Sequence, residues 1–125
     1  MLNGLAILIV EDEAFIAIDL ADAITDLGGV VIGPVASVAE ALTLTEHDHL
    51  DAAILDANLL DRDVTPVALR LGQLGVAFVL HSATGIPRDL AAVHPNVPLV
   101  GKPARPSAVL AVLLQHVAAN RGGII

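Results

Sequence analysis

The sequence predicts an α/β domain with a doubly wound, five-stranded parallel sheet that has helices on both faces. Short runs rich in β-branched residues alternate five times with longer segments whose apolar residues recur at helical spacing. Because neighbouring parallel strands need long crossover connections, these helical segments are expected to cross over the sheet. The 125 residues also match the length of one compact core and contain no linker or internal repeat, so we expect a single domain over residues 1–125.

The expected strands are the apolar runs. The first run, residues 5–10, is apolar throughout, which is typical of a strand buried on both faces. The other four expected strands are residues 30–32, 52–56, 76–81 and 97–100.

The expected helices begin and end at recognisable signals. The first has five apolar residues at helical spacing and ends at Gly28 and Gly29. Those five residues are Phe15, Ile16, Leu20, Ile24 and Leu27. Ser37, with Glu40 three positions later, forms a capping box that opens a second helix over residues 38–46. The remaining helices are expected at residues 64–71, 87–93 and 106–120, the last ended by the Arg-Gly-Gly of residues 121–123.

Composition excludes several classes of function. With 14 acidic against 6 basic side chains the net charge is −8, so phosphate-mediated nucleic-acid binding is not expected. The chain has no cysteine, which excludes disulfides and thiolate metal sites. No segment reaches the roughly 18 to 20 unbroken apolar residues of a spanning helix, so membrane insertion is not expected. The N-terminal residues lack the basic region of a secretory signal, and we expect a soluble, cytoplasmic domain.

Charged residues stand where three of the expected strands end. The first strand stops at Glu11-Asp12-Glu13, the third at Asp56, and the fifth just before Lys102, the only lysine of the chain. Since the carboxyl ends of parallel strands share one edge, these carboxylates and the lysine are expected to meet there.

That combination is typical of metal-assisted phosphoryl chemistry. Mg²⁺ prefers carboxylate and carbonyl oxygens, and Asp12 and Asp56 would supply two of them. A carboxylate beside the metal can attack phosphorus and form an aspartyl phosphate. Lys102 would then neutralise one phosphoryl oxygen, and the hydroxyl of Ser82, which follows the fourth strand, would donate to another.

Four motifs in chain order give the sequence a resemblance to a known family. They are Val10-Glu11-Asp12-Glu13, Leu55-Asp56-Ala57-Asn58-Leu59, Ser82-Ala83 and Lys102-Pro103. Each motif alone is weak, but all four at this spacing resemble the receiver domain of two-component response regulators, the CheY-like superfamily. The resemblance extends over nearly the whole chain.

The resemblance implies a fold, a cofactor and partners. The fold is the flavodoxin-like (βα)5 arrangement with strand order 2-1-3-4-5, and the Lys102-Pro103 peptide is cis. The phosphoacceptor is Asp56, and the donor is a phosphohistidine on a histidine kinase or a histidine phosphotransfer protein. Mg²⁺ is held by Asp12, by Asp56, by Glu11 through water and by the backbone carbonyl of Asn58.

The sequence departs from the family pattern at several positions. Leu60 and Arg62 replace a proline and a glycine after the phosphoacceptor. Leu99 and Ala104 stand where aromatic residues are common, and without Tyr or Trp the usual rotation of an aromatic ring cannot transmit the signal. Ser82 is favoured as the hydroxyl donor, and Thr84 is the alternative.

Each candidate residue also has a simpler interpretation. Acids at residues 11–13 suit a helix N-terminus, where the dipole favours them by about 0.3 to 1 kcal/mol. Asp56 and Ser82 fit turns, Asn58 fits a plain loop, and Lys102 fits a surface charge. The co-occurrence of these residues favours the site. His47 and His49 are interpreted as a solvated loop, and His81, His94 and His116 form no hydrolase arrangement with a serine.

The last expected helix is apolar all round over residues 108–114, although covering a sheet needs only one apolar stripe. We therefore expect a homodimer or partner surface formed by the fourth helix, fifth strand and fifth helix, as the resemblance also implies. Substitution of Leu113 and Leu114 by Glu tests it, and an Ala/Leu-rich surface without a partner is the alternative.

Three functions remain open from the sequence. The first is a phosphoacceptor that changes its protein contacts, an enzyme only in self-phosphorylation and autodephosphorylation. The second is a receiver-like binding module that works without phosphorylation, suggested by Leu60, Arg62 and Leu99. The third is a Mg²⁺-dependent phosphatase, which is disfavoured because position 58 is Asn and offers no general acid two residues after Asp56.

Overall fold

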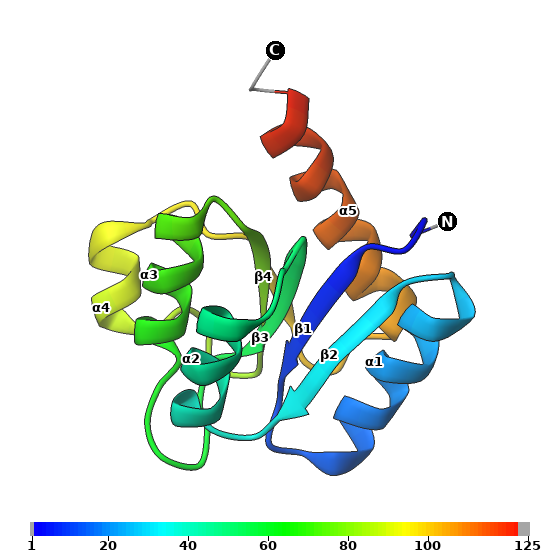
Figure 1. Ribbon diagram of the computed structural model, residues 1–125. Coiled ribbons are helices and arrows are strands. Elements are labelled where there is room, and N and C mark those ends of the chain that lie inside the picture. The colour runs from blue at the N-terminus through cyan, green and yellow to red at the C-terminus, as the bar shows by residue number, and fades with distance from the viewer. Residues whose placement is uncertain (1, 123–125) are drawn as a thin grey trace.

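The computed structural model describes residues 2–122, and within them strands and helices alternate along the chain (Figure 1). The strands are β1 (Ala6–Val10), β2 (Val30–Val35), β3 (Ala52–Asp56), β4 (Ala77–Ser82) and β5 (Leu99–Gly101). The helices are α1 (Ala14–Asp26), α2 (Val38–His47), α3 (Thr65–Leu74), α4 (Arg88–Val93) and α5 (Pro106–Gly122).

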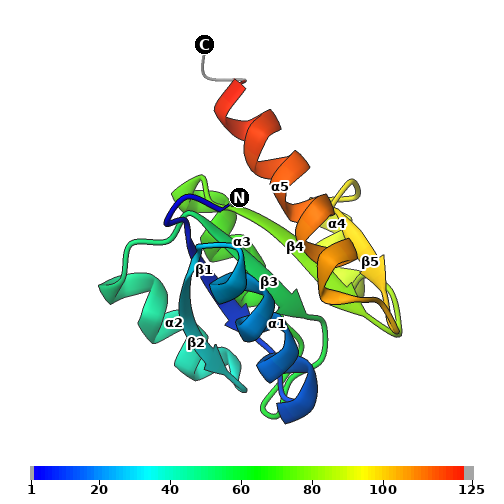
Figure 2. The ribbon, with the colours of Figure 1, turned by 90° about the vertical axis from the view of Figure 1, so that its right-hand side faces the viewer.

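All neighbouring strands are parallel, and their order is β2-β1-β3-β4-β5, which confirms the predicted fold class and strand order. Helices α1 and α5 cover one face of the sheet, and α2, α3 and α4 cover the other (Figures 1 and 2). Because all the strands are parallel, each crossover returns the chain to the same end of the sheet, and the last residues of all five strands lie at one edge.

Alternation along the strands divides the core into two layers. Ile7, Ile54 and Val79 point to the α1/α5 face, and their neighbours Leu8, Leu55 and Leu80 point to the opposite face. All six side chains are 0–1% exposed. The central strands are thus buried on both sides, as their continuous apolar runs indicate.

Several strand boundaries differ from the prediction. Strand β2 continues beyond residue 32 to Val35, through a cis Gly33-Pro34 peptide. Proline is tolerated there because β2 is an edge strand. Gly33 has a φ of 90°, and an added Cβ would lie 3.0 Å from the carbonyl oxygen of Ile9. Strand β5 begins at Leu99 rather than at residue 97, since Pro98 has no backbone N–H to donate.

Helix boundaries also shift. Helix α3 begins at Thr65 and continues past residue 71 to Leu74, where Gly75 ends it in the left-handed conformation. The predicted cap of α2 is present, because the Ser37 Oγ accepts from the Glu40 N–H at 3.2 Å. The hydroxyl also donates to the Glu40 carboxylate at 2.9 Å.

Exposure divides the apolar residues of two helices. Phe15 of α1, one of the five that recur at helical spacing, is 86% exposed, while Ala17, Leu20 and Ile24 face the core. Leu113 of α5 is completely buried, so it belongs to the core and not to a partner surface. Among the described residues, no helix is long and apolar enough to cross a membrane.

Candidate functional site

Three carboxylates gather at the carboxyl edge of the sheet. Glu11 and Asp12 follow β1, and Asp56 is the last residue of β3. One oxygen from each lies within 4.8 Å of the others. Because Glu11 and Asp56 are only 4% and 7% exposed, water screens their charges poorly. A group of oxygen ligands this close suits a small divalent cation such as Mg²⁺.

Lys102 extends from the end of β5 into this cluster. Its Nζ lies 3.0 Å from Glu11 Oε1, 3.4 Å from Asp56 Oδ2 and 3.6 Å from Glu13 Oε1. Burial lowers the pKa of Lys102, but the hydrogen bond to Glu11 and the surrounding negative charges outweigh that effect and raise it. Lys102 therefore stays charged, and its peptide bond to Pro103 is cis, as the resemblance implies.

One lysine does not balance the acids. Burial, followed by hydrogen bonds to Glu11 and Asp12, raises the pKa of Asp56 from 3.8 to about 8, although Lys102 acts in the opposite direction. Without a cation, the Asp56 carboxyl therefore retains a proton near neutral pH. A divalent cation would replace that proton, so the donor set fits the metal that the sequence predicts.

The alternation of the strands explains why these side chains meet. Glu11, Asp56 and Lys102 continue the positions of Ile9, Ile54 and Val100, which line the α1/α5 layer. Glu11 and Asp56 thus form the next row of that layer, with carboxylates in place of aliphatic side chains, and Lys102 lies one row further, because Val100 is in register with His81 and so with Asp56.

His81 belongs to the same row, and the sequence analysis did not assign it to the site. It is paired in register with Asp56 on one side and with Val100 on the other. It is 3% exposed, and burial lowers the pKa of its imidazole. The signal for it was available, since His81 follows Val79 by two positions in a strand.

Ser82 and Thr84 form one hydrogen-bonded group at the end of β4. Ser82 is 3% exposed, and its Oγ accepts from the Thr84 N–H at 3.1 Å. The two hydroxyl oxygens are 3.3 Å apart. The side chain of Asn58, for which only the backbone carbonyl was considered, donates to the Thr84 Oγ1 at 2.9 Å.

The loop after Asp56 is fixed to the start of α2. The Asp61 carboxylate accepts from the N–H groups of Val38 and Ala39 at 2.8 and 3.1 Å. These bonds satisfy two free donors of the α2 N-terminus. The loop carries Leu60, which is 74% exposed, and closes where the Val64 N–H donates to the Ala57 carbonyl at 2.9 Å. The role of Asp61 could not be read from the sequence, since its partners are over twenty positions away.

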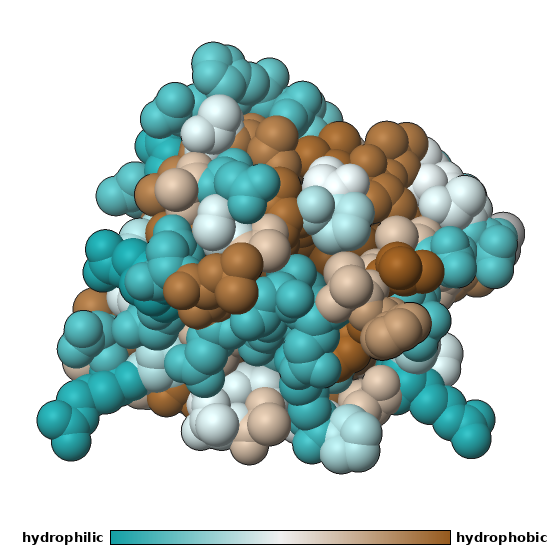
Figure 3. Space-filling model, turned by 90° about the horizontal axis from the view of Figure 1, so that it is seen from below, coloured by the Kyte–Doolittle hydropathy of each residue, from teal (hydrophilic) through white to brown (hydrophobic). Residues whose placement is uncertain are grey.

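Figure 3 shows the molecule from the side on which β2 ends. Hydrophilic side chains run through the middle of this face, and separate hydrophobic groups lie beside them. Among the hydrophobic residues at this edge, Phe15 of α1 and Leu60 are the most exposed, at 86% and 74%. The charged cluster therefore lies within a face that also offers apolar contacts.

A scan against protein-family models and a search of curated proteins find no match. Solved structures match along most of the chain. SdrG from Sphingomonas melonis Fr1 is 35% identical, with a TM-score of 0.74 over 91% of this chain and 99% of that one. A response regulator receiver protein from Sinorhizobium medicae WSM419 is 23% identical, with a TM-score of 0.79 over 96% and 99% of the two chains.

A third structure bears on the metal. The receiver domain of a sensor histidine kinase from Pseudomonas aeruginosa PAO1 is 20% identical, with a TM-score of 0.77 over 92% of this chain and 98% of that one. That domain was crystallised with a magnesium ion coordinated in its active-site cleft. With the strand order and the placement of its four motifs, this chain belongs to the CheY-like receiver domains of response regulators.

Proposed function

We propose that the domain is a phosphoacceptor in a two-component or phosphorelay system. Asp56 takes a phosphoryl group from a phosphohistidine of a histidine kinase or phosphotransfer protein, and the product changes the domain's contacts with other proteins. The observation that carries this proposal is the position of Lys102, whose Nζ lies 3.4 Å from Asp56 within a group of three carboxylates.

The residues divide the chemistry among themselves. An Asp56 oxygen attacks the phosphorus, and the phosphorus–nitrogen bond of the donor breaks. The bonding electrons stay on that nitrogen, and the imidazole leaves as a neutral ring because its other nitrogen carries a proton. Lys102 balances a phosphoryl oxygen once Asp56 no longer carries the negative charge. Ser82 or Thr84 donates a hydroxyl hydrogen bond to another oxygen; both are open, because their hydroxyls are in contact.

The metal would be held by Asp12 and Asp56, with Glu11 acting through water and Asn58 through its backbone carbonyl. When bound, Mg²⁺ supplies positive charge that reduces repulsion between the acids and the incoming phosphoryl group. Asp12 is less buried than Glu11, so it is accessible as a direct ligand. Glu11 bonds Lys102 at 3.0 Å, which favours an indirect role.

A binding module that works without phosphorylation remains the second candidate. Leu60 is 74% exposed and Leu99 is 41% exposed, so apolar contacts are available without any chemical change. A phosphatase is less well supported, because position 58 is an asparagine whose side chain bonds Thr84.

Self-association through α4, β5 and α5 also remains a proposal. With Leu113 in the core, the large exposed apolar residues described on this surface are Val93 on α4, at 59%, and Leu99 on β5, at 41%. Replacing both by Glu is expected to abolish a dimer without unfolding the domain, as measured by sedimentation. A stable dimer in the double variant would contradict this surface.

Incubation with a small acyl phosphate and Mg²⁺, followed by intact-mass measurement, tests the main proposal. We expect one phosphoryl adduct on the wild-type chain and on Asp22→Asn, a matched carboxylate change on the exposed side of α1. Asp56→Asn and a chelator should each remove the adduct. An unmodified wild-type chain would favour the binding module, and repeated turnover of a phosphomonoester would favour the phosphatase.

A further inference from the structure

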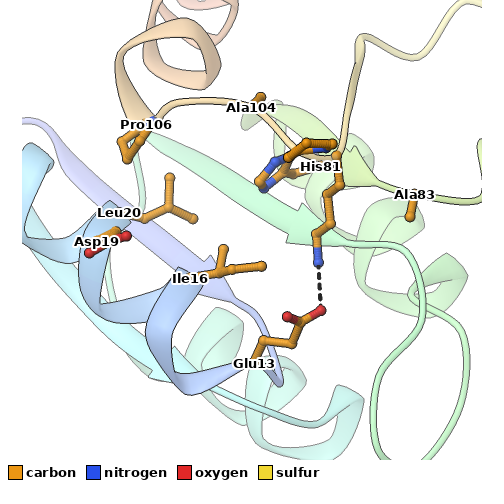
Figure 4. A pocket seen from close by; sticks show the side chains of 10 residues that line it. Glu13, Ile16, Asp19, Leu20, His81, Ala83, Ala104 and Pro106 are labelled. Atoms are coloured by element: carbon orange, nitrogen blue, oxygen red, sulfur yellow. Dashed lines mark ion pairs between the residues drawn. The ribbon is translucent and has the colours of Figure 1, made fainter.

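A pocket of about 410 Å³ opens between α1, the end of β4 and the segment that joins β5 to α5. Ile16 and Leu20 of α1 form one wall, and Ala104 and Pro106 lie across from them (Figure 4). Most of its surface is apolar, and its size falls within the range of about 300 to 1,000 Å³ that is typical of small-molecule sites.

A buried polar group lines this pocket. The His81 ring extends from β4 between Ala104 and the α1 wall (Figure 4). Its exposure is 3%, and among the described residues neither ring nitrogen has a hydrogen-bond partner. Such buried polar groups normally have a partner, and leaving one without costs about 1 to 3 kcal/mol. The missing partner is therefore to be sought in whatever fills the pocket.

The chain has no aromatic ring of its own to fill this space. It contains two phenylalanines and no tyrosine or tryptophan. Phe15 is 86% exposed, and Phe78 belongs to the core layer on the opposite face of the sheet. At the pocket wall, the side chain of Ala104 ends at its Cβ.

Charge at the rim defines the ligand further. Lys102 and Glu13 meet at the rim, with Nζ 3.6 Å from Oε1, and Asp19 lies on the other side of the pocket, beside Leu20 (Figure 4). An anion would meet the two acids, and a cation would meet Lys102, so an uncharged ligand is favoured. A neutral imidazole has one N–H donor and one acceptor nitrogen. A hydroxyl group can serve either nitrogen, whichever of them carries the hydrogen.

We propose that this pocket is a binding site for a small, uncharged ring compound with a hydroxyl group, of the phenol class. The ring packs against Ile16, Leu20 and Ala104, and the hydroxyl bonds to His81. The pocket adjoins the acidic cluster, because His81 is paired in register with Asp56. The proposal concerns the unphosphorylated domain, so it does not depend on the proposed function.

Titration with phenol tests the proposal directly. Since the chain has no Tyr or Trp, the fluorescence of phenol is measured without protein background. We expect saturable binding at one site, with shifts of the Ile16 methyl and His81 ring signals in NMR spectra. Toluene should bind about 2- to 10-fold more weakly, the effect of one net hydrogen bond. Equal affinity for phenol and toluene, or no saturable binding, would overturn the proposal.

Three variants locate the site. Ala104→Phe fills the pocket and is expected to weaken phenol binding at least about tenfold, since the ligand and the new ring compete for one volume. Ala111→Phe adds the same ring at an exposed position of α5 outside the pocket and should bind as the wild type does. His81→Leu should still bind toluene but lose the preference for phenol, which keeps the test decisive if Ala104→Phe fails to fold. Undiminished binding by a folded Ala104→Phe, or a phenol preference retained in His81→Leu, would refute the site.

Discussion

The two faces of the sheet are built from similar aliphatic residues but end differently. The α2/α3/α4 layer contains Phe78 and ends at Ala57 and Ser82, where the loop after β3 and short polar side chains cover it. The α1/α5 layer contains no Phe, Tyr or Trp and ends in the charged row of Glu11 and Asp56, with the uncharged His81 beside Asp56 and Lys102 one row further along β5. One face therefore holds the charged side chains, and the other is covered by the loop that follows β3.

The difference shows that the site is continuous with one core layer. Its charged groups are held by the same alternation that places Ile9, Ile54 and Val79 in the interior. Disturbing that layer should disturb the site, whereas disturbing the opposite layer should act through the loop and α2. The predictions below test this division, from the largest expected effect on stability to the smallest.

The largest effect is expected in the core of the α1/α5 layer. Leu113→Ala removes a completely buried side chain and should lower the free energy of unfolding by about 2 to 5 kcal/mol. Leu114→Ala, at a partly buried position beside it, should cost clearly less. Urea denaturation measures both. Equal losses would mean that α5 does not present one buried side to the sheet.

The charged row should make the stability of the metal-free domain depend on pH. The pKa of Asp56 is raised to about 8 in the folded state, so the folded chain binds this proton more tightly than the unfolded chain does. Its stabilising contribution is complete below the unfolded pKa of 3.8 and is lost as the pH rises through about 8. Above that pH, Asp56→Asn should be more stable than the wild type by about 1 to 3 kcal/mol.

Mg²⁺ provides the control for this prediction. If the cation replaces the proton, adding it should stabilise the wild type at high pH and leave Asp56→Asn much less affected. Thermal denaturation at several pH values, with and without Mg²⁺, gives all four comparisons. Because every other titrating group is common to both chains, parallel pH profiles would show that Asp56 does not carry the excess proton.

A smaller effect is expected where the loop meets the opposite layer. Asp61→Ala removes two hydrogen bonds to the α2 N-terminus and should cost about 0.5 to 2 kcal/mol, as the loss of a helix cap does. Ser37→Ala, which removes the local cap of the same helix, is the matched comparison. If Asp61 connects the site to α2, amide exchange in α2 should increase more in Asp61→Ala than in Ser37→Ala. The reverse order would contradict this connection.

Strong local signals made most of the fold predictable from the sequence. The apolar runs and charged strand ends fixed β1 and β3 to within one residue, and the cis Lys102-Pro103 peptide followed from the resemblance. The extension of β2 through Pro34 was missed because an edge strand tolerates a residue that the local pattern excludes. The exposure of Phe15 does not follow from its hydrophobicity, because its position in the first turn of α1 faces outward.

Site residues could be predicted where their position at a strand end marks them in the sequence. They could not be predicted where their role depends on contacts between segments far apart in the chain. Glu11, Asp56 and Lys102 are recognisable because each stands at a strand end with its charge. His81 contributes through its register with Asp56, and Asp61 through contacts with a helix 22 and 23 positions earlier in the chain. Neither relation exists in a linear pattern, so both needed the folded structure.

The smallest effect on stability and a large effect on partner recognition are expected together at Phe15. The side chain is 86% exposed at the start of α1, directly after the acidic residues, so Phe15→Ala should change stability by no more than about 0.5 kcal/mol. Under the proposed function, this ring contacts the protein that carries the phosphohistidine. Phe15→Ala should then slow phosphoryl transfer from such a protein about tenfold, a loss typical of a buried aromatic contact, and leave transfer from a small acyl phosphate unchanged.

The control is Val30→Ala, which changes an exposed apolar residue at the start of β2 and hence at the opposite edge of the sheet. Equal rates for Phe15→Ala and the wild type with a protein donor would place the partner elsewhere, and equal slowing with both donors would assign Phe15 to the chemistry of the site instead.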